Sequence, residues 1–241
     1  MKARLVITGI SLLALLAVGG LGAAALRLPA PEQCLGSYGT SLRGRTRSQV
    51  YNALRAARAL HGAEIPPGGV FSYNRRVGPW NAAAGYRKAP VSYDGEMMPS
   101  YGGGVCQTST TLYNAALLAG LEVVERHRHI RPPTYVAPGR DAAVAMPSID
   151  LRLRNPYPHP VRLEARRVGD SLVVAVRGRG PRRPVVVRTE VEAVAQPPEV
   201  RGAGQRKPGQ PGFTSLTYVL RGKKGQVLGH EAYPPVNSLK P

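Results

Sequence analysis

Acidic residues are scarce in this chain of 241 residues: 14 Asp and Glu stand against 33 Lys and Arg, a formal net charge of +19. A surface of this kind is drawn to anionic lipid head groups or to acidic wall polymers. Aromatic residues are also few, at 6%, whereas 28 Gly and 23 Pro predict many turns, with strands and loops outweighing helix. The hydrophobic share of 43% nevertheless excludes a disordered tail and suits one sizeable domain with a smaller appendage. A second explanation for the basic excess is the arginine- and alanine-rich usage of a GC-rich genome.

Only two cysteines are present, Cys34 and Cys106, so at most one intramolecular disulfide can form. A bridge between them is one interpretation, because paired cysteines are common in exported proteins. A free thiol at Cys106 is the other, and the glycines that precede it favour this second interpretation.

Residues 1–34 are predicted to form an export segment with a short linker. Met1-Lys-Ala-Arg4 is basic, and an uncharged run rich in Leu, Ala and Val extends from Leu5 to Leu26. This order is typical of an export signal, and about 20 apolar residues suffice to span a bilayer. Cleavage near residues 23–25 and retention as a membrane anchor both stay open. Either one places the protein in the cell envelope or outside the cell, which argues against nucleic acid as a partner.

Hydrophobic periodicity predicts an α+β domain over 35–180 and a small β-rich unit over 181–241. Arg47–Leu60 has apolar residues at helical spacing, with Ser48 as the candidate N-cap. The alternating stretches 161–165 and 171–176 should pair as antiparallel strands across Gly169-Asp170. Further strands are expected at 70–73, 89–93, 121–125, 148–155, 184–195, 214–221 and 226–232.

The segment Tyr101-Gly-Gly-Gly-Val-Cys-Gln-Thr-Ser-Thr110 carries the chemistry that the sequence suggests. Without side chains at Gly103 and Gly104, a substrate could approach the backbone closely beside Cys106. A helical pattern from 108 to 119 puts the cysteine just before or at a helix N-terminus, where the peptide dipoles favour a thiolate. Cys106 is therefore a candidate nucleophile.

A thiol nucleophile needs a base or a positive neighbour, and His127 and His129 follow a predicted strand. We expect only one of the two rings to face Cys106. We expect His129 to be the base, with His127 as the second choice. A metal site and a purely structural role are the alternatives for these histidines, and no metal is expected.

Other residues complete the predicted site. Arg126 or Arg140 could hold a carboxylate of the substrate, and nearby arginines would lower the pKa of the thiol. Asp141 and Asp150 are expected at a turn and a strand end, although Asp141 could orient a histidine. Backbone amides at 105–107 could form an oxyanion hole. The candidate lining residues are Tyr101, Gln107 and Tyr113.

Several motifs in the same order resemble the VanW family, which is named for an accessory protein of vancomycin resistance clusters. The resemblance covers 35–180. Its motifs are Pro67-Gly-Gly-Val-Phe-Ser-Tyr-Asn74, Gly102-Gly-Gly-Val-Cys-Gln-Thr-Ser-Thr-Thr-Leu-Tyr-Asn-Ala-Ala116, Glu125-Arg-His-Arg-His129, Tyr135-Val-Ala-Pro-Gly-Arg-Asp-Ala142 and Asp150-Leu-Arg-Leu-Arg-Asn155. The C-terminal unit faintly resembles a G5 domain, a small wall-associated β module, through Gly202, Gly204, Gly209 and Gly212.

The resemblance implies a cell-envelope protein, and some VanW-containing proteins are described as L,D-transpeptidases that cross-link peptidoglycan through a cysteine. That cysteine corresponds to Cys106, and the family's His-x-His motif corresponds to His127 and His129, with Arg128 where asparagine is often found. The expected substrate is a peptidoglycan stem peptide, and no cofactor is required. The rival interpretation is a non-catalytic accessory protein that binds peptidoglycan or a glycopeptide.

Overall fold

The computed structural model describes residues 31–93, 96–181, 184–197, 199–201, 209, 211–222, 224–235 and 238–240. The predicted export segment, residues 1–30, lies outside this part of the chain. Within it, no helix is both long and apolar enough to cross a bilayer. The described chain is mixed and strand-rich, which is compatible with the α+β class.

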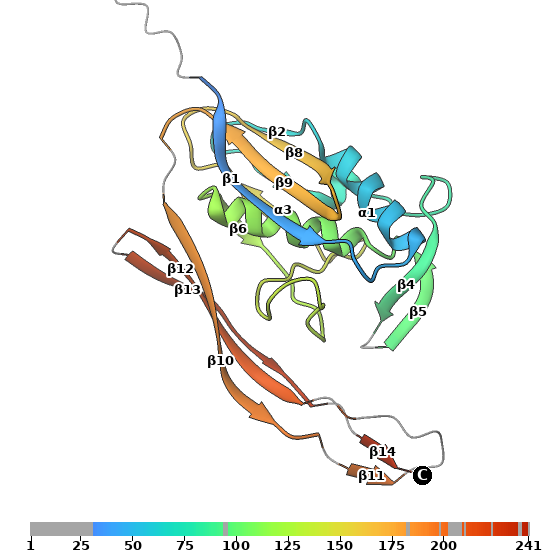
Figure 1. Cartoon of the computed structure of the whole chain (residues 1–241). Coiled ribbons are helices and arrows are strands. Elements are labelled where there is room, and N and C mark those ends of the chain that lie inside the picture. Colours follow the sequence, from blue (N-terminus) through green and yellow to red (C-terminus); the bar gives the residue numbers. More distant parts are fainter. Residues whose placement is uncertain are drawn as a thin grey trace, which may run out of the picture. The chain divides into compact units, whose positions relative to one another are not determined.

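A four-stranded antiparallel sheet forms one layer of the domain (Figure 1). Its order is β1 (Gln33–Ser41), β9 (Ser171–Gly178), β8 (Val161–Val168) and β2 (Glu64–Ile65). Buried residues alternate along β8 and β9, so one face packs against the helices α1 (Arg47–Leu60) and α3 (Val105–Leu118). The predicted hairpin is confirmed, since Val168 pairs with Ser171.

Strand β1 has no counterpart among the predicted strands. Its sequence contains two glycines, Gly36 and Gly39, which weaken a strand pattern. A Cβ at Gly36 would lie 2.4 Å from the backbone nitrogen of Ala119, at the end of α3. Strand and helix therefore approach too closely for a side chain, and glycine is required there by packing.

Helix α1 has the predicted bounds, but its N-cap is Thr46 and not Ser48. The Thr46 hydroxyl accepts the Gln49 backbone N–H, and the Gln49 side chain accepts the Thr46 backbone N–H. This reciprocal capping box satisfies two amides that the first turn would leave unpaired. The cap directs the buried face of α1, Ala53, Ala56, Ala57 and Leu60, into the core.

Helix α3 begins at Val105, three residues before the predicted start, so Cys106 lies inside its first turn. All of its residues except Cys106 and Leu118 are buried. Its buried hydroxyl groups have acceptors: Thr108 donates to the carbonyl of Ala53 at 2.9 Å, and Thr111 donates to Gln107 at 2.6 Å. A helix with polar side chains can therefore lie at the centre of the domain, because these two hydroxyl groups have hydrogen-bond acceptors.

A second sheet has the order β3 (Val70–Ser72), β7 (Arg152–Arg154) and β6 (Glu122–Glu125). The strand predicted over 148–155 is only three residues long. Asp150 lies outside the ladder because its carboxylate accepts the Ser72 hydroxyl at 2.5 Å and the Asn74 N–H at 2.8 Å. These bonds lie at the start of the short helix α2 (Tyr73–Val77), which ends the strand predicted over 70–73.

The hairpin of β4 (Lys88–Tyr93) and β5 (Glu96–Tyr101) leads directly into the three glycines before α3. Strand β4 agrees with the predicted strand at 89–93, whereas β5 was not predicted.

Towards the C-terminus, β10 (Val185–Ala195), β12 (Gly212–Arg221) and β13 (Lys224–Tyr233) form an antiparallel sheet, as the strand patterns predicted. A parallel pair, β11 (Glu199–Arg201) and β14 (Ser238–Lys240), follows. Gly202 and Gly204, which contribute to the G5 resemblance, lie outside the described residues. Strand β13 matters for the site because its end carries Glu231 and Tyr233.

Candidate active site

Cys106 is half-buried in the first turn of α3. The N-cap, Gly104, has a φ of 110°, a left-handed conformation that favours glycine. A Cβ at Gly104 would also lie 2.3 Å from the carbonyl oxygen of Gln49. The thiol donates to the carbonyl of Val144 at 3.4 Å. The glycine conformation at the N-cap thus places the half-buried sulfur at the N-terminus of α3, the positive end of the helix dipole.

His129 and Asp141 continue the hydrogen bonding that begins at the thiol. Nδ1 of His129 lies 2.6 Å from Oδ2 of Asp141, and the same oxygen accepts the His129 backbone N–H at 2.7 Å. The imidazole also interacts with the Cys106 side chain, through a hydrogen bond and through its charge. In this arrangement a carboxylate orients an imidazole that can exchange a proton with a nucleophile.

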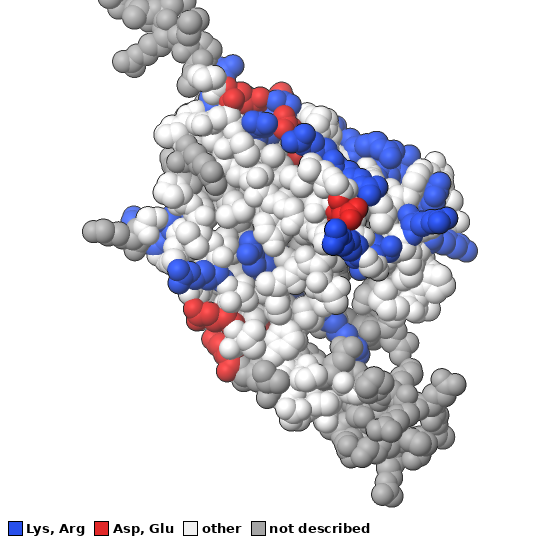
Figure 2. Space-filling model, in the orientation of Figure 1, with Lys and Arg blue, Asp and Glu red and all other residues white. Residues whose placement is uncertain are grey.

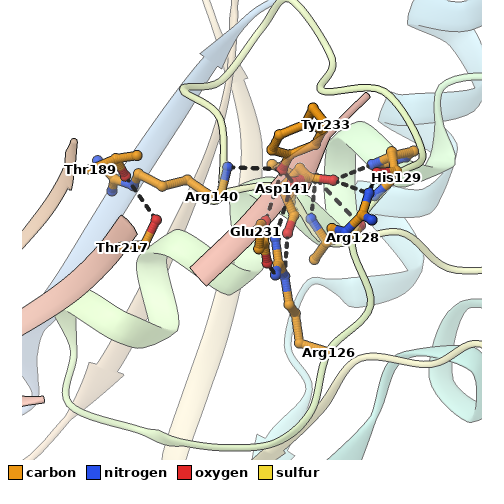
Figure 3. Close-up of polar contacts among 12 residues, drawn as sticks. Arg126, Arg128, His129, Arg140, Asp141, Thr189, Thr217, Glu231 and Tyr233 are labelled. Atoms are coloured by element: carbon orange, nitrogen blue, oxygen red, sulfur yellow. Dashed lines mark hydrogen bonds and ion pairs between the residues drawn. The ribbon is translucent and has the colours of Figure 1, made fainter. Parts of the chain in front are cut away.

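Several groups converge on Asp141, whose side chain is fully buried (Figure 3). Arg126 donates to Oδ1 at 3.0 Å and to the Asp141 carbonyl at 2.6 Å, and it also forms an ion pair with Glu231. The Tyr233 hydroxyl lies 3.5 Å from Oδ1 and donates to Glu231 at 2.8 Å. The C-terminal sheet therefore supports the site through Asp141.

The protonation states follow from these contacts. Burial raises the pKa of Cys106, but the hydrogen bond and charge of His129 lower it by more, to below its ordinary value. Burial lowers the pKa of His129, yet its bonds to Asp141 and Cys106 raise it to about 10. Burial raises the pKa of Asp141, and His129 and Arg126 bring it below its ordinary value. These shifts favour a thiolate and an imidazolium beside a carboxylate.

Two tyrosines border the thiol. Tyr73 is fully buried and donates its hydroxyl to the carbonyl of Val105 at 3.2 Å. Burial raises the pKa of Tyr73 and of Tyr135, and the negative charge of Cys106 raises both further. Both rings therefore stay neutral. Sequence reasoning had assigned neither of them to the site.

The structure separates the two candidate histidines. Nε2 of His127 lies 3.0 Å from a carboxylate oxygen of Glu125, and the His127 side chain is 45% exposed. Of the two, only His129 interacts with Cys106. Strand alternation does not explain this difference, because positions i and i+2 of a strand share one face and both histidines follow the end of β6 at Glu125.

Three predicted substrate contacts instead pack α3 against its neighbours. A Cβ at Gly103 would lie 2.6 Å from the Pro90 carbonyl oxygen, and Gly104 lies against α1. The Gln107 side chain is buried and donates to the Thr40 hydroxyl at 3.1 Å and to the Ser41 carbonyl at 2.8 Å.

The other residues predicted to bind or surround the substrate also contact groups of the protein itself or lie in its core. Arg126 is held by Asp141 and Glu231, while Arg140 donates to the Asn114 side chain at 2.8 Å. Tyr101 is 39% exposed at the end of β5, and the ammonium of Lys88 lies 5.6 Å from its ring centre. Tyr113 is buried in the core.

The backbone N–H groups at the start of α3 differ in whether they have a hydrogen-bond acceptor. Val105 donates to the Gly102 carbonyl at 2.9 Å, and Gln107 donates to the Gly104 carbonyl at 3.1 Å. Among the described residues, the N–H of Cys106 has no acceptor. A free donor beside the sulfur is what an oxyanion site requires.

Both cysteines are free thiols, so the alternative of a Cys34–Cys106 bridge is wrong for this structure. Over the described ranges, no group of three or more His, Cys, Asp and Glu could hold a metal ion. Asp141 had a weak sequence signal, as an acid near the histidines. Glu231 and Tyr233 had none, because about ninety residues separate Tyr233 from Asp141 along the chain.

A sequence model of the family described as VanW like protein matches residues 48–177, which is more than half of the chain. The uncharacterized protein YoaR of Bacillus subtilis is 38% identical over 144 residues, covering 60% of this chain and 48% of that protein. The vancomycin B-type resistance protein VanW of Enterococcus faecalis is 31% identical over 113 residues, covering 45% of this chain and 41% of that protein. The chain spans about half the length of these curated relatives. No solved structure matches.

Replacing Asp141 by Asn is expected to slow alkylation of Cys106 by iodoacetamide at neutral pH by on the order of tenfold, the effect of about one pKa unit. The neutral amide cannot stabilise the imidazolium, so the pKa of His129 falls. Loss of the imidazolium then raises the pKa of Cys106 by more than removal of the Asp141 charge lowers it, because His129 contributes more to that pKa than Asp141 does. The measurement is the alkylation rate against pH in a Cys34→Ser background, followed by mass spectrometry. Asp170→Asn on the exposed hairpin is the control. Superimposable profiles for Asp141→Asn and its parent would contradict the assignment.

Proposed function

Because the chain belongs to the VanW family, we propose that it acts in the cell envelope as a cysteine-dependent L,D-transpeptidase- or carboxypeptidase-like enzyme on peptidoglycan stem peptides. The observation that carries this proposal is the Cys106–His129–Asp141 chain of contacts at the start of α3. The family resemblance supplies the cell-wall context. We do not propose vancomycin resistance, which the name of the Enterococcus relative gives, for this chain. Function depends on the site, and a shared fold does not carry it over.

In the first half of the reaction, the Cys106 thiolate attacks the carbonyl carbon of an L,D peptide bond. The N–H of Cys106 is available to stabilise the negative oxygen that forms. As the C–N bond breaks, the His129 imidazolium gives its proton to the leaving amine. The terminal D-residue departs as a free amino acid, and the rest of the stem stays on the sulfur as a thioester.

In the second half, His129 is neutral and accepts a proton from the incoming nucleophile. An amine of a neighbouring stem gives a cross-link, and water gives a trimmed stem. The C–S bond breaks, and the original thiolate and imidazolium are restored. Asp141 keeps the ring in one orientation throughout and stabilises its charged form.

We further assign one basic surface to the anionic polymers of the cell wall. In Figure 2, Lys and Arg side chains gather over the part of the molecule that carries α1 and the β4–β5 hairpin. A hollow of about 340 Å³ between α1 and residues 77–86 is lined by Arg55, Arg58 and Tyr86, among others, and by no acidic residue. Within the described part of the chain neither arginine forms an ion pair with a carboxylate, and the guanidinium carbon of Arg55 lies 5.4 Å from the ring centre of Tyr86. Unpaired guanidinium groups suit phosphate and carboxylate ligands.

The catalytic proposal predicts an acyl-enzyme. Incubating the full chain with muropeptides should add to Cys106 the mass of a stem peptide that lacks its terminal D-residue, as detected by peptide mass spectrometry. Cys34→Ser should retain the adduct and Cys106→Ala should abolish it, while His129→Ala should slow its formation by on the order of a hundredfold or more. If no adduct forms, and Cys106→Ala still binds peptidoglycan like the parent, the non-catalytic accessory role is the correct one.

The polymer proposal predicts that Arg55→Gln with Arg58→Gln lowers co-sedimentation of the full chain with wall sacculi that carry anionic polymer, several-fold at low ionic strength and less at high salt. The matched control is Arg166→Gln with Arg179→Gln, because these exposed arginines lie outside the hollow and their loss changes the net charge equally. An equal loss in both double variants, or binding to anionic vesicles alone, would refute a specific polymer site.

A further inference from the structure

The proposed reaction leaves open what binds the carboxylate of its substrate, since Arg126 and Arg140 are held by protein groups. The loop between β1 and α1 supplies another guanidinium, that of Arg45. The loop begins beside the start of α3, because the side chain of Gln107, one residue after Cys106, donates to the carbonyl of Ser41, the last residue of β1, at 2.8 Å.

The charge of Arg45 is uncompensated. Its guanidinium carbon lies 5.2 Å from the ring centre of Tyr135, and its Nε is buried without a hydrogen-bond partner. Among the described residues no carboxylate forms an ion pair with it, whereas the nearby Arg43 binds Asp170 at 3.0 Å. A buried donor without an acceptor is costly, and a bound anion would remove that cost.

Tyr135 connects this arginine with the nucleophile. Burial raises the pKa of Tyr135, the charge of Cys106 raises it further, and Arg45 lowers it. The ring is therefore within electrostatic range of both groups. Because Tyr135 stays neutral, it does not neutralise Arg45. An anion bound at the guanidinium would lie near an aromatic ring that is within electrostatic range of the thiol.

We propose that Arg45, stacked on Tyr135, binds the free C-terminal carboxylate of the substrate peptide beside Cys106. This inference rests on the proposed function and narrows its substrate class. The part of the peptide that follows the scissile bond leaves as the amine, so a C-terminal carboxylate held at Arg45 belongs to the leaving residue. The enzyme would then release the last D-residue of a stem peptide and would not cut within a longer chain. Arg45 is thus a specificity-determining residue.

Two probes of Cys106 test this inference without turnover, in the full chain with Cys34→Ser. Iodoacetate carries a carboxylate, and iodoacetamide carries a neutral amide of similar shape. The ratio of the two alkylation rates does not depend on the intrinsic reactivity of the thiolate. It therefore measures the effect of positive charge beside the sulfur. Arg45→Gln is expected to lower the iodoacetate-to-iodoacetamide ratio by roughly threefold or more. Arg43→Gln, a matched loss of charge in the same loop, should leave the ratio unaltered. An unchanged ratio in Arg45→Gln overturns the proposal.

A second measurement needs no Arg45 variant. N-acetyl-D-alanine should protect Cys106 from iodoacetamide, and N-acetyl-D-alaninamide, which lacks the carboxylate, should not. Equal protection by the two compounds, or none by either, counts against the site. Failure of the reaction itself is a separate result, because an absent acyl-enzyme refutes the proposed function while the rate ratio and the protection report only on Arg45.

Discussion

The site depends on one buried carboxylate, that of Asp141. It fixes both the ring and the backbone of His129, and Arg126 compensates its charge. Removing a carboxylate from water costs several kcal/mol unless charged and hydrogen-bonding partners replace the water, so the groups around Asp141 must assemble together. The same carboxylate favours the imidazolium, and the imidazolium favours the thiolate. Folding and thiol reactivity therefore depend on the same contacts.

The pH range over which these contacts stabilise the fold follows from the pKa shifts. The lowered pKa of Asp141 gives stability that is present above its unfolded value, about 3.9, and is lost as pH falls through the folded value. The raised pKa of His129 gives stability that is complete below about 6.5 and is lost as pH rises through about 10. The lowered pKa of Cys106 adds stability at the alkaline side of its folded pKa. Asp141 and His129 together therefore stabilise the folded state fully between about pH 3.9 and about 6.5, and Cys106 offsets part of the loss above that range.

Local patterns predicted several elements of the fold, and they picked out Cys106 and His129, which the structure brings together. The apolar spacing in α1 and the alternation in β8 and β9 are strong signals, and the glycines before Cys106 drew attention to this cysteine. Strand β1 was missed because Gly36 serves helix packing and not strand propensity. Gly103, Gly104 and Gln107 were placed at the substrate, although they hold α3 in the core, because a sequence shows a glycine but not what it touches. Contacts between distant segments, such as Asp141 with Tyr233 or Arg45 with Tyr135, have no local signature at all.

The central claim is that Asp141 and Cys106 keep His129 charged, and a pH titration of the histidine ring signals by NMR in the full chain tests it most directly. The signals of His129 should stay those of an imidazolium well above pH 6.5, the ordinary histidine pKa, and titrate near the raised value of about 10. Cys106→Ala should lower that midpoint. A His129 ring that titrates near its ordinary pKa in the parent protein, with no response to Cys106→Ala, would contradict the claim.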